Sequence, residues 1–265
     1  MLSRRGFLLA SSVLLAGDAN RPSSVTLAVG DRDASLPEEF VRRAARFTRC
    51  YTANPEAARG REAILHGQFP HLGAGGLALT DVLKSAVVLD GDRNTHPSDD
   101  TLVVFAKARA SDDDTWFDKS TRVPLQFFWP RRIAAAEFDL LASTVDIMPT
   151  ILGLCGVPAP EGLQGVDFSP WLLRGSGARP ESIYAEGRLG TRQSWRMLVR
   201  GLDKLVFTPR LEILHLYNLG QDPGENTDLA GDPALERKLD ELRAIAADWM
   251  RRLGDHIDPS GLKRR

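Results

Sequence analysis

The stretch TLVVF at residues 101–105 decides the fold class of this chain. It is an almost unbroken apolar run, without the polar alternation of a half-exposed strand, and such runs are typical of strands buried on both faces of a parallel sheet. VTLAV at 25–29 has the same texture and ends at Gly30-Asp31. We therefore expect these two strands in one mostly parallel sheet, and we interpret Val123 to Trp129 as another buried parallel strand.

Segments with helical periodicity lie between these strands. Leu36 to Arg46 has charges on one side and apolar residues on the other, which predicts an amphipathic helix. The stretch 139–156 holds a second helix, with Ser143 or Asp146 as its N-cap and Gly156 at its end. Strands that alternate with helices favour an α/β core, which we assign to residues 20–182.

The texture changes near residue 183. Short strands are predicted there at 183–185, 196–200, 204–208 and 213–219. A final helix from Pro233 to Leu253, with Asp232 as its cap, carries apolar residues every three or four positions. We predict a C-terminal α+β subdomain over 183–265, in which this helix covers a small antiparallel sheet.

Composition excludes several classes of protein. The 265 residues carry 34 Lys and Arg against 35 Asp and Glu, a formal net charge of −1. The chain lacks the excess of basic residues that binding to nucleic acid would require. A hydrophobic content of 43% with 26% charged residues is ordinary for a globular protein, and two cysteines exclude a disulfide framework and a four-thiolate zinc site.

The first nineteen residues match a twin-arginine export signal. SRRGFLL at 3–9 places Arg4-Arg5 before an apolar run that is too short to span a bilayer, and Gly17-Asp18-Ala19 offers a cleavage site. We expect residues 1–19 to be removed and the chain to be exported to the periplasm or cell exterior, with no transmembrane anchor left.

Five spaced stretches resemble the second half of a sulfatase of the alkaline-phosphatase-like superfamily. They are TRVPLQFFWP (121–130), STVDIMPTILGLCGVP (143–158), LQGVDFSPWL (163–172), YAEG (184–187) and LYNLGQDPGENTDLA (216–230). The resemblance implies a mostly parallel sheet flanked by helices, followed by a small antiparallel sheet with a helix.

The first half resembles the same family with pieces missing. RPSSVTLAVGD at 21–31 is similar to the opening metal-binding strand, residues 46–71 to the nucleophile segment, and TLVVFAKARA at 101–110 to the strand of a second metal loop. Family members are commonly far longer, so we interpret the chain as truncated, with a deletion around Ser85 to Leu89.

The resemblance implies a formylglycine nucleophile made from Cys, and that position falls on Ala57. Of the motif C-x-P-S-R only the last residue, Arg61, is retained. An alanine has no heteroatom with which to attack sulfur. Cys50 lacks the motif and is interpreted as a small buried apolar residue.

The calcium ligands of the family are depleted as well. The opening pair falls on Gly30 and Asp31, which leaves one vestigial carboxylate, and the later pair falls on Ala108 and Arg109, whose charge would repel a cation. We expect no cofactor, or calcium if any site survives. The run Asp112–Asp114 is either a relocated ligand set or, as we prefer, a solvated acidic turn.

Two side chains remain as residual anion contacts, Arg61 and His71, each with a structural role as the alternative. The pocket Lys of the family has no convincing counterpart, because Lys119 stands where the family usually has Gly. We therefore expect no catalytic residue.

We predict an exported, sulfatase-like protein that is catalytically degenerate, with a sulfated small molecule or glycan as its partner. A working sulfuric-ester hydrolase with relocated site residues is the alternative. A phosphodiesterase or phosphatase of the same superfamily is a second alternative, but it needs a hydroxyl at position 57, which Ala57 denies.

Overall fold

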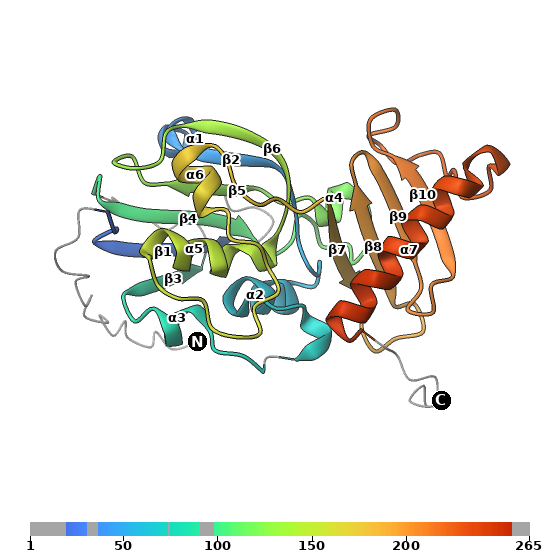
Figure 1. Ribbon diagram of the computed structural model, residues 1–265, viewed down its shortest axis with the longest axis horizontal. Coiled ribbons are helices and arrows are strands. Elements are labelled where there is room, and N and C mark those ends of the chain that lie inside the picture. Colours follow the sequence, from blue (N-terminus) through green and yellow to red (C-terminus); the bar gives the residue numbers. More distant parts are fainter. Residues whose placement is uncertain (1–19, 31–36, 74, 91–97, 256–265) are drawn as a thin grey trace, which may run out of the picture.

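The computed structural model describes residues 20–30, 37–73, 75–90 and 98–255. The proposed signal at 1–19 and the metal-ligand candidate Asp31 lie outside these ranges. Two sheets define the architecture (Figure 1). The strands are β1 (Ser24–Gly30), β2 (Ala45–Tyr51), β3 (Ala86–Asp90), β4 (Thr101–Lys107), β5 (Leu125–Phe128), β6 (Ala136–Ser143), β7 (Ser182–Gly187), β8 (Trp195–Arg200), β9 (Asp203–Phe207) and β10 (Ile213–Asn218).

Helices flank both sheets. They are α1 (Glu38–Arg43), α2 (Ala57–His66), α3 (Leu79–Val82), α4 (Asp118–Thr121), α5 (Ile147–Cys155), α6 (Ser169–Arg174) and α7 (Glu236–Leu253), with 3₁₀ turns η1 (Pro70–Leu72), η2 (Thr144–Asp146) and η3 (Pro233–Leu235). Within the described ranges, every helix is too short or too polar to cross a membrane.

The larger sheet has the strand order β3-β1-β4-β5-β2-β6. β1 pairs in parallel with β3 and β4, and β2 pairs in parallel with β6. The expectation that VTLAV and TLVVF lie in one mostly parallel sheet is confirmed.

The direction of the strand near Val123 was predicted wrongly. β5 runs antiparallel to both of its neighbours, β4 and β2. The loop from β4 to β5 contains only the single-turn helix α4, so the chain does not cross back to the other end of the sheet and β5 returns beside β4. An apolar run reports burial on both faces, and it does not report strand direction.

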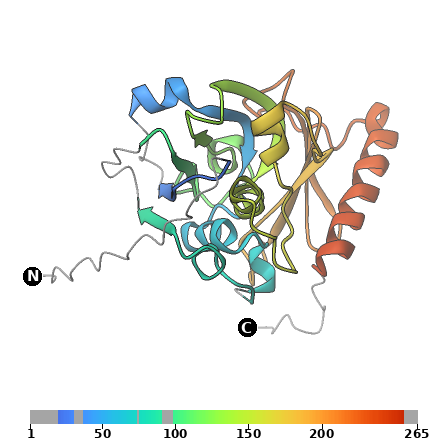
Figure 2. The same ribbon diagram turned by 60° about the vertical axis from the view of Figure 1, so that its left-hand side comes forward.

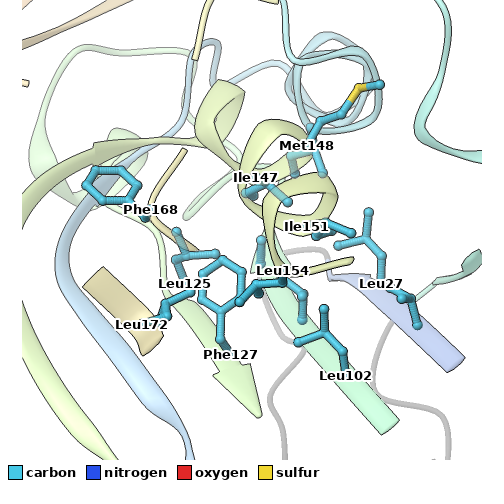
Figure 3. Packing of buried hydrophobic residues seen from close by; sticks show 14 of the residues in the cluster. Leu27, Leu102, Leu125, Phe127, Ile147, Met148, Ile151, Leu154, Phe168 and Leu172 are labelled. Carbon is cyan, nitrogen blue, oxygen red and sulfur yellow. The ribbon is translucent and has the colours of Figure 1, made fainter. Parts of the chain in front are cut away.

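The core lies between the larger sheet and α5. Strand residues of one face, including Leu27, Leu102 and Phe127, pack against Ile147 and Ile151 of the helix (Figure 3). Phe40 of α1 packs on the opposite face, with its ring centroid 5.1 Å from that of Phe128. Helices on both faces explain why these strands are apolar throughout.

α5 begins as its sequence predicts. Asp146 is its N-cap, and the carboxylate accepts hydrogen bonds from the Ser143 N–H (2.6 Å) and the Val166 N–H (2.7 Å). Burial raises the pKa of this carboxyl to about 7, although both N–H groups oppose the shift. Gly156 ends the helix at φ 62°. Residues 136–143, however, form β6 and no part of the helix.

The second sheet is antiparallel in the order β10-β9-β8-β7. α7 runs along one of its faces (Figures 1 and 2). Leu242 and Ala246 of this helix lie in one buried cluster with Leu198 and Leu205 of the sheet. The Asp232 side chain accepts from the Ala234 N–H (2.9 Å) and so caps η3, which leads directly into α7. The predicted covering helix is confirmed, although its first three residues, 233–235, form this 3₁₀ turn.

Candidate functional site

The carboxyl ends of β1 and β4 and the start of α2 meet at one place. The Ala108 N–H, just beyond β4, donates to the Gly30 carbonyl at 3.1 Å. A Cβ built on Gly60 of α2 would lie 2.3 Å from the Ala108 carbonyl oxygen and 2.7 Å from that of Asn54. The helix that opens with Ala57 is therefore seated directly on the end of β4. The structure thus brings together Gly30, Ala108 and the start of α2.

No side chain at the start of α2 offers a nucleophile. Ala57 is half-buried and carries only a methyl group. The hydroxyl of Thr52, fully buried nearby, lies 2.7 Å from the Ala108 carbonyl and 2.8 Å from the Asn54 carbonyl. Its single proton is engaged by these backbone oxygens, so it is held as a structural group. Among the described residues at the start of α2, neither Ala57 nor Thr52 offers a free nucleophile.

The described residues at this place do not fit a calcium ion. Ala108 offers no side-chain oxygen, and the Arg109 guanidinium lies 3.0 Å from Asp112. Calcium takes six to eight oxygen ligands, several of them carboxylates. A cation at position 109 opposes such a site.

The acidic loop is paired with cations of its own. Lys119 lies 3.3 Å from Asp113, and Asp114 accepts from the Arg188 backbone N–H at 3.2 Å. Burial raises the pKa of Asp114, while the N–H of Arg188 opposes the rise. Asp112 and Asp113 are thus paired with basic side chains, as in an acidic turn, whereas Asp114 accepts only a backbone N–H, and its Oδ1 has no hydrogen-bond partner among the described residues.

The two candidate anion contacts, Arg61 and His71, lie on different elements, α2 and η1. Arg61 is half-buried in α2, one residue beyond Gly60. His71 instead faces the C-terminal unit, with its Nδ1 2.7 Å from Glu186 Oε2 of β7. His71 is consequently a link between the α/β core and the second sheet.

Asn54 is a site residue that sequence reasoning missed. It is fully buried before α2, and its Oδ1 accepts from the Glu56 N–H at 2.9 Å. Its Nδ2 has no hydrogen-bond partner among the described residues. Among the described residues no side chain caps α2, so the N–H groups of its first turn and Asn54 Nδ2 together form a concentration of donors. Only the spacing to Ala57 could have drawn attention to Asn54.

Glu225, inside the DPGE stretch, has a structural role. The Lys204 ammonium is fully buried and lies 2.6 Å from Glu225 Oε1 and 2.5 Å from Asp118 Oδ1. Glu225 Oε2 also accepts from the Asp118 N–H. The motif therefore joins the second sheet to α4 through buried, paired charges.

Cys50 is buried in the larger sheet with no exposed surface, as predicted. Burial raises the pKa of its thiol well above the usual value, and the Asp146 carboxylate raises it further. A thiol in that environment stays protonated and inert.

Taken together, this mixed and mostly parallel sheet, with helices on both faces and a small antiparallel sheet, defines an α/β protein of alkaline-phosphatase-like fold. The family model described as "N-sulphoglucosamine sulphohydrolase, C-terminal" matches residues 109–249. The chain belongs to the sulfatase family.

Relatives and solved structures agree with this assignment. The chain is 28% identical to the Delta 4,5-hexuronate-2-O-sulfatase of Bacteroides thetaiotaomicron over 152 residues. This match covers 53% of this chain and 31% of the relative. It is 33% identical over 162 residues to human arylsulfatase A, which covers 50% of this chain and 32% of the relative. The chain spans about a third of the length of these relatives.

The fold is also that of solved sulfatases. The 2-O GAG sulfatase BT1596 superimposes with a TM-score of 0.77 at 14% identity, over 92% of this chain and 96% of that chain. At this identity the likeness concerns the fold alone.

Proposed function

We propose that this chain is an exported member of the sulfatase family that binds a sulfated saccharide without hydrolysing it. The observation that carries the proposal is Ala57 at the first residue of α2, where a methyl group stands in place of a nucleophile. Family membership and fold support a sulfatase-like function in the coarse sense, and the residues at the site argue against turnover.

The start of α2 supports binding of an anion. The first-turn N–H groups of a helix carry a partial positive charge and point outward along the axis, which suits sulfate or phosphate oxygens. Asn54 Nδ2, which has no hydrogen-bond partner within the described part of the chain, adds a buried donor at the same place. Arg59, which pairs with Glu56 at 2.8 Å, and Arg61 add positive charge on the same helix.

The ligand class rests on the names of the relatives. One relative is named as a hexuronate-2-O-sulfatase and a solved structure as a GAG sulfatase, so both act on sulfated sugars. We carry over only the shared chemistry, an anionic sulfate ester on a saccharide. The proposal requires no metal, because the described residues at Ala108 and Arg109 do not make a calcium site.

Calorimetry with a 2-O-sulfated unsaturated uronate disaccharide and with its desulfated form tests this proposal. We expect binding of the sulfated form only, weakened by about tenfold or more in Asn54→Asp, since the substitution is nearly isosteric and replaces a donor by a carboxylate. Asn218→Asp, distant from α2, is the matched control and should bind normally.

Two results would overturn the proposal. Equal affinity for both saccharides would mean that the sulfate is not recognised. Release of inorganic sulfate during the titration, abolished by a chelator, would mean that the chain is an active, metal-dependent hydrolase.

A further inference from the structure

A cluster of buried charges lies where α7 ends against the second sheet. Arg196 of β8 is 1% exposed, and its Nη2 donates to Asp255 Oδ1 at 2.7 Å. The Arg196 Nε and the Tyr184 hydroxyl both donate to Asp255 Oδ2. Glu186 of β7 is fully buried, with Oε2 3.9 Å from Arg196 Nε. One arginine thus stands between two carboxylates.

His71 enters this cluster from the α/β core. Its backbone N–H donates to Glu186 Oε1 at 2.8 Å, and its ring Nδ1 lies 2.7 Å from Glu186 Oε2. The other ring nitrogen, Nε2, lies 3.2 Å from the carbonyl oxygen of Leu253, the last residue of α7. One imidazole therefore touches both β7 and the carboxyl end of α7.

The two contacts of the ring determine its protonation. A neutral imidazole donates from one nitrogen only, whereas a carboxylate and a backbone carbonyl both accept. Both contacts are satisfied together only when His71 is the imidazolium. The cluster then contains two positive groups, His71 and Arg196, and two negative groups, Glu186 and Asp255, so that its buried charges balance.

The same residues do not make a metal site. Ligand atoms of His71, Glu186 and Asp255 all lie within 4.8 Å of one another. Asp255, however, is engaged by the Arg196 fork, and both His71 nitrogens already face acceptors. A divalent cation would add to two positive charges that are already in place.

We propose that His71 is a proton-dependent clasp that holds the carboxyl end of α7 against the α/β core. Loss of one ring proton leaves either Glu186 or the Leu253 carbonyl without its donor and leaves a net negative charge among buried groups. The end of α7 then opens more readily, while the rest of the helix stays packed through Leu242 and Ala246. This inference is independent of the proposed saccharide site.

The direction of the pH effect follows from the neighbours of His71. Burial lowers its pKa, but the hydrogen bond and charge of Glu186, and then the charge of Asp255, raise it above the usual 6.5 overall. Arg196 acts against this rise, and Tyr184 stays neutral because burial raises its pKa well above the usual value. The folded state therefore keeps the proton longer than the open state does. The clasp is complete below about pH 6.5 and is lost as pH rises through the raised pKa.

Amide exchange at the end of α7 gives a local readout of the clasp. The Asp255 N–H donates to the Met250 carbonyl (2.9 Å) and the Gly254 N–H to that of Arg251 (3.3 Å). After correction for intrinsic base catalysis, we expect their opening equilibrium to rise by up to about tenfold per pH unit between pH 6.5 and the raised pKa. In His71→Gln the opening should be high at pH 6 and independent of pH.

His215→Gln is the matched control, because His215 forms a more exposed pair with Asp228 at 2.8 Å. It should keep the pH dependence of the unsubstituted chain. Nitrogen chemical shifts of the His71 ring in the unsubstituted chain provide a test that needs no variant, and both nitrogens should be protonated at pH 6. A neutral ring at pH 6, or exchange at Gly254 and Asp255 that is as fast in the unsubstituted chain as in His71→Gln, would overturn the proposal.

Discussion

Gly60 is one residue at which the site differs from the family motif that this sequence resembles. The family motif has Ser at this position, but here a Cβ would meet two backbone carbonyl oxygens, those of Ala108 and Asn54. Backbone cannot rotate out of the way as a side chain can. The absent Cβ therefore lets α2 sit on the strand end where the family resemblance places a metal ligand.

We predict that Gly60→Ala destabilises the chain by about 1–3 kcal/mol through overpacking, although alanine normally favours a helix. Urea unfolding measures the change. Gly231→Ala, which would meet nothing within 4 Å, is the control and should stay within about 0.5 kcal/mol of the unsubstituted chain. A stabilised Gly60→Ala variant would contradict the close seating of α2.

Among the elements, the family-like stretch around Asp146 forms the start of α5, where the Asp146 carboxyl group accepts two backbone hydrogen bonds. Since burial raises its pKa to about 7, the folded state holds a proton that the unfolded state has lost between about pH 4 and pH 7. This group is expected to lower the free energy of unfolding as pH rises through that window, by at most about 1.4 kcal/mol per pH unit.

Asp146→Asn should remove this slope and, through one lost backbone hydrogen bond, lower the free energy of unfolding by about 1–3 kcal/mol. Denaturation of both forms at pH 4.5 and pH 7.5 measures the difference, and parallel pH profiles would show that Asp146 is ionised throughout.

The elements that sequence predicted best are those whose pattern reports burial. Apolar runs predicted β1 and β4, and the stripe of α7 with its Asp232 cap predicted the covering helix. Residues 139–143 were included in the stretch 139–156 that was predicted to hold a helix, yet they belong to β6, which pairs as a strand with β2. At the site, the motif spacing located Ala57 and Ala108. Glu186, the partner of His71, lies 115 positions further along the sequence, and no local pattern predicts a pair with that separation.

At the scale of the whole molecule, two sheets are joined by buried, paired charges on both sides of the second sheet. Lys204 with Glu225 and Asp118 ties it to α4, and His71 with Glu186 ties it to η1. The subdomain proposed from residue 183 is thus fastened to the core by groups that must remain ionised, which makes its attachment sensitive to pH.

Export is predicted from the sequence alone. Changing Arg4 and Arg5 together to Lys keeps the charge of the proposed signal and removes the guanidinium pair that defines the twin-arginine pattern. We expect the variant to stay in the cytoplasm, as measured by cell fractionation with an immunoblot. A substitution of Arg251 and Arg252 to Lys, on the surface of α7, is the control and should not alter export. Equal export of both variants would contradict the signal.

We propose that this chain keeps the sulfatase scaffold and has lost the chemistry of the family. Removal of a nucleophile costs about a millionfold in kcat in hydrolases that form covalent intermediates. The most direct test is turnover of a chromogenic aryl sulfate by the purified chain, with calcium binding followed by calorimetry on the same sample. We predict no hydrolysis above background, with or without calcium, and no rescue by Ala57→Cys, because Arg59 and Gly60 also break the motif. Turnover together with micromolar calcium affinity, both lost in Asp31→Ala, would contradict the claim.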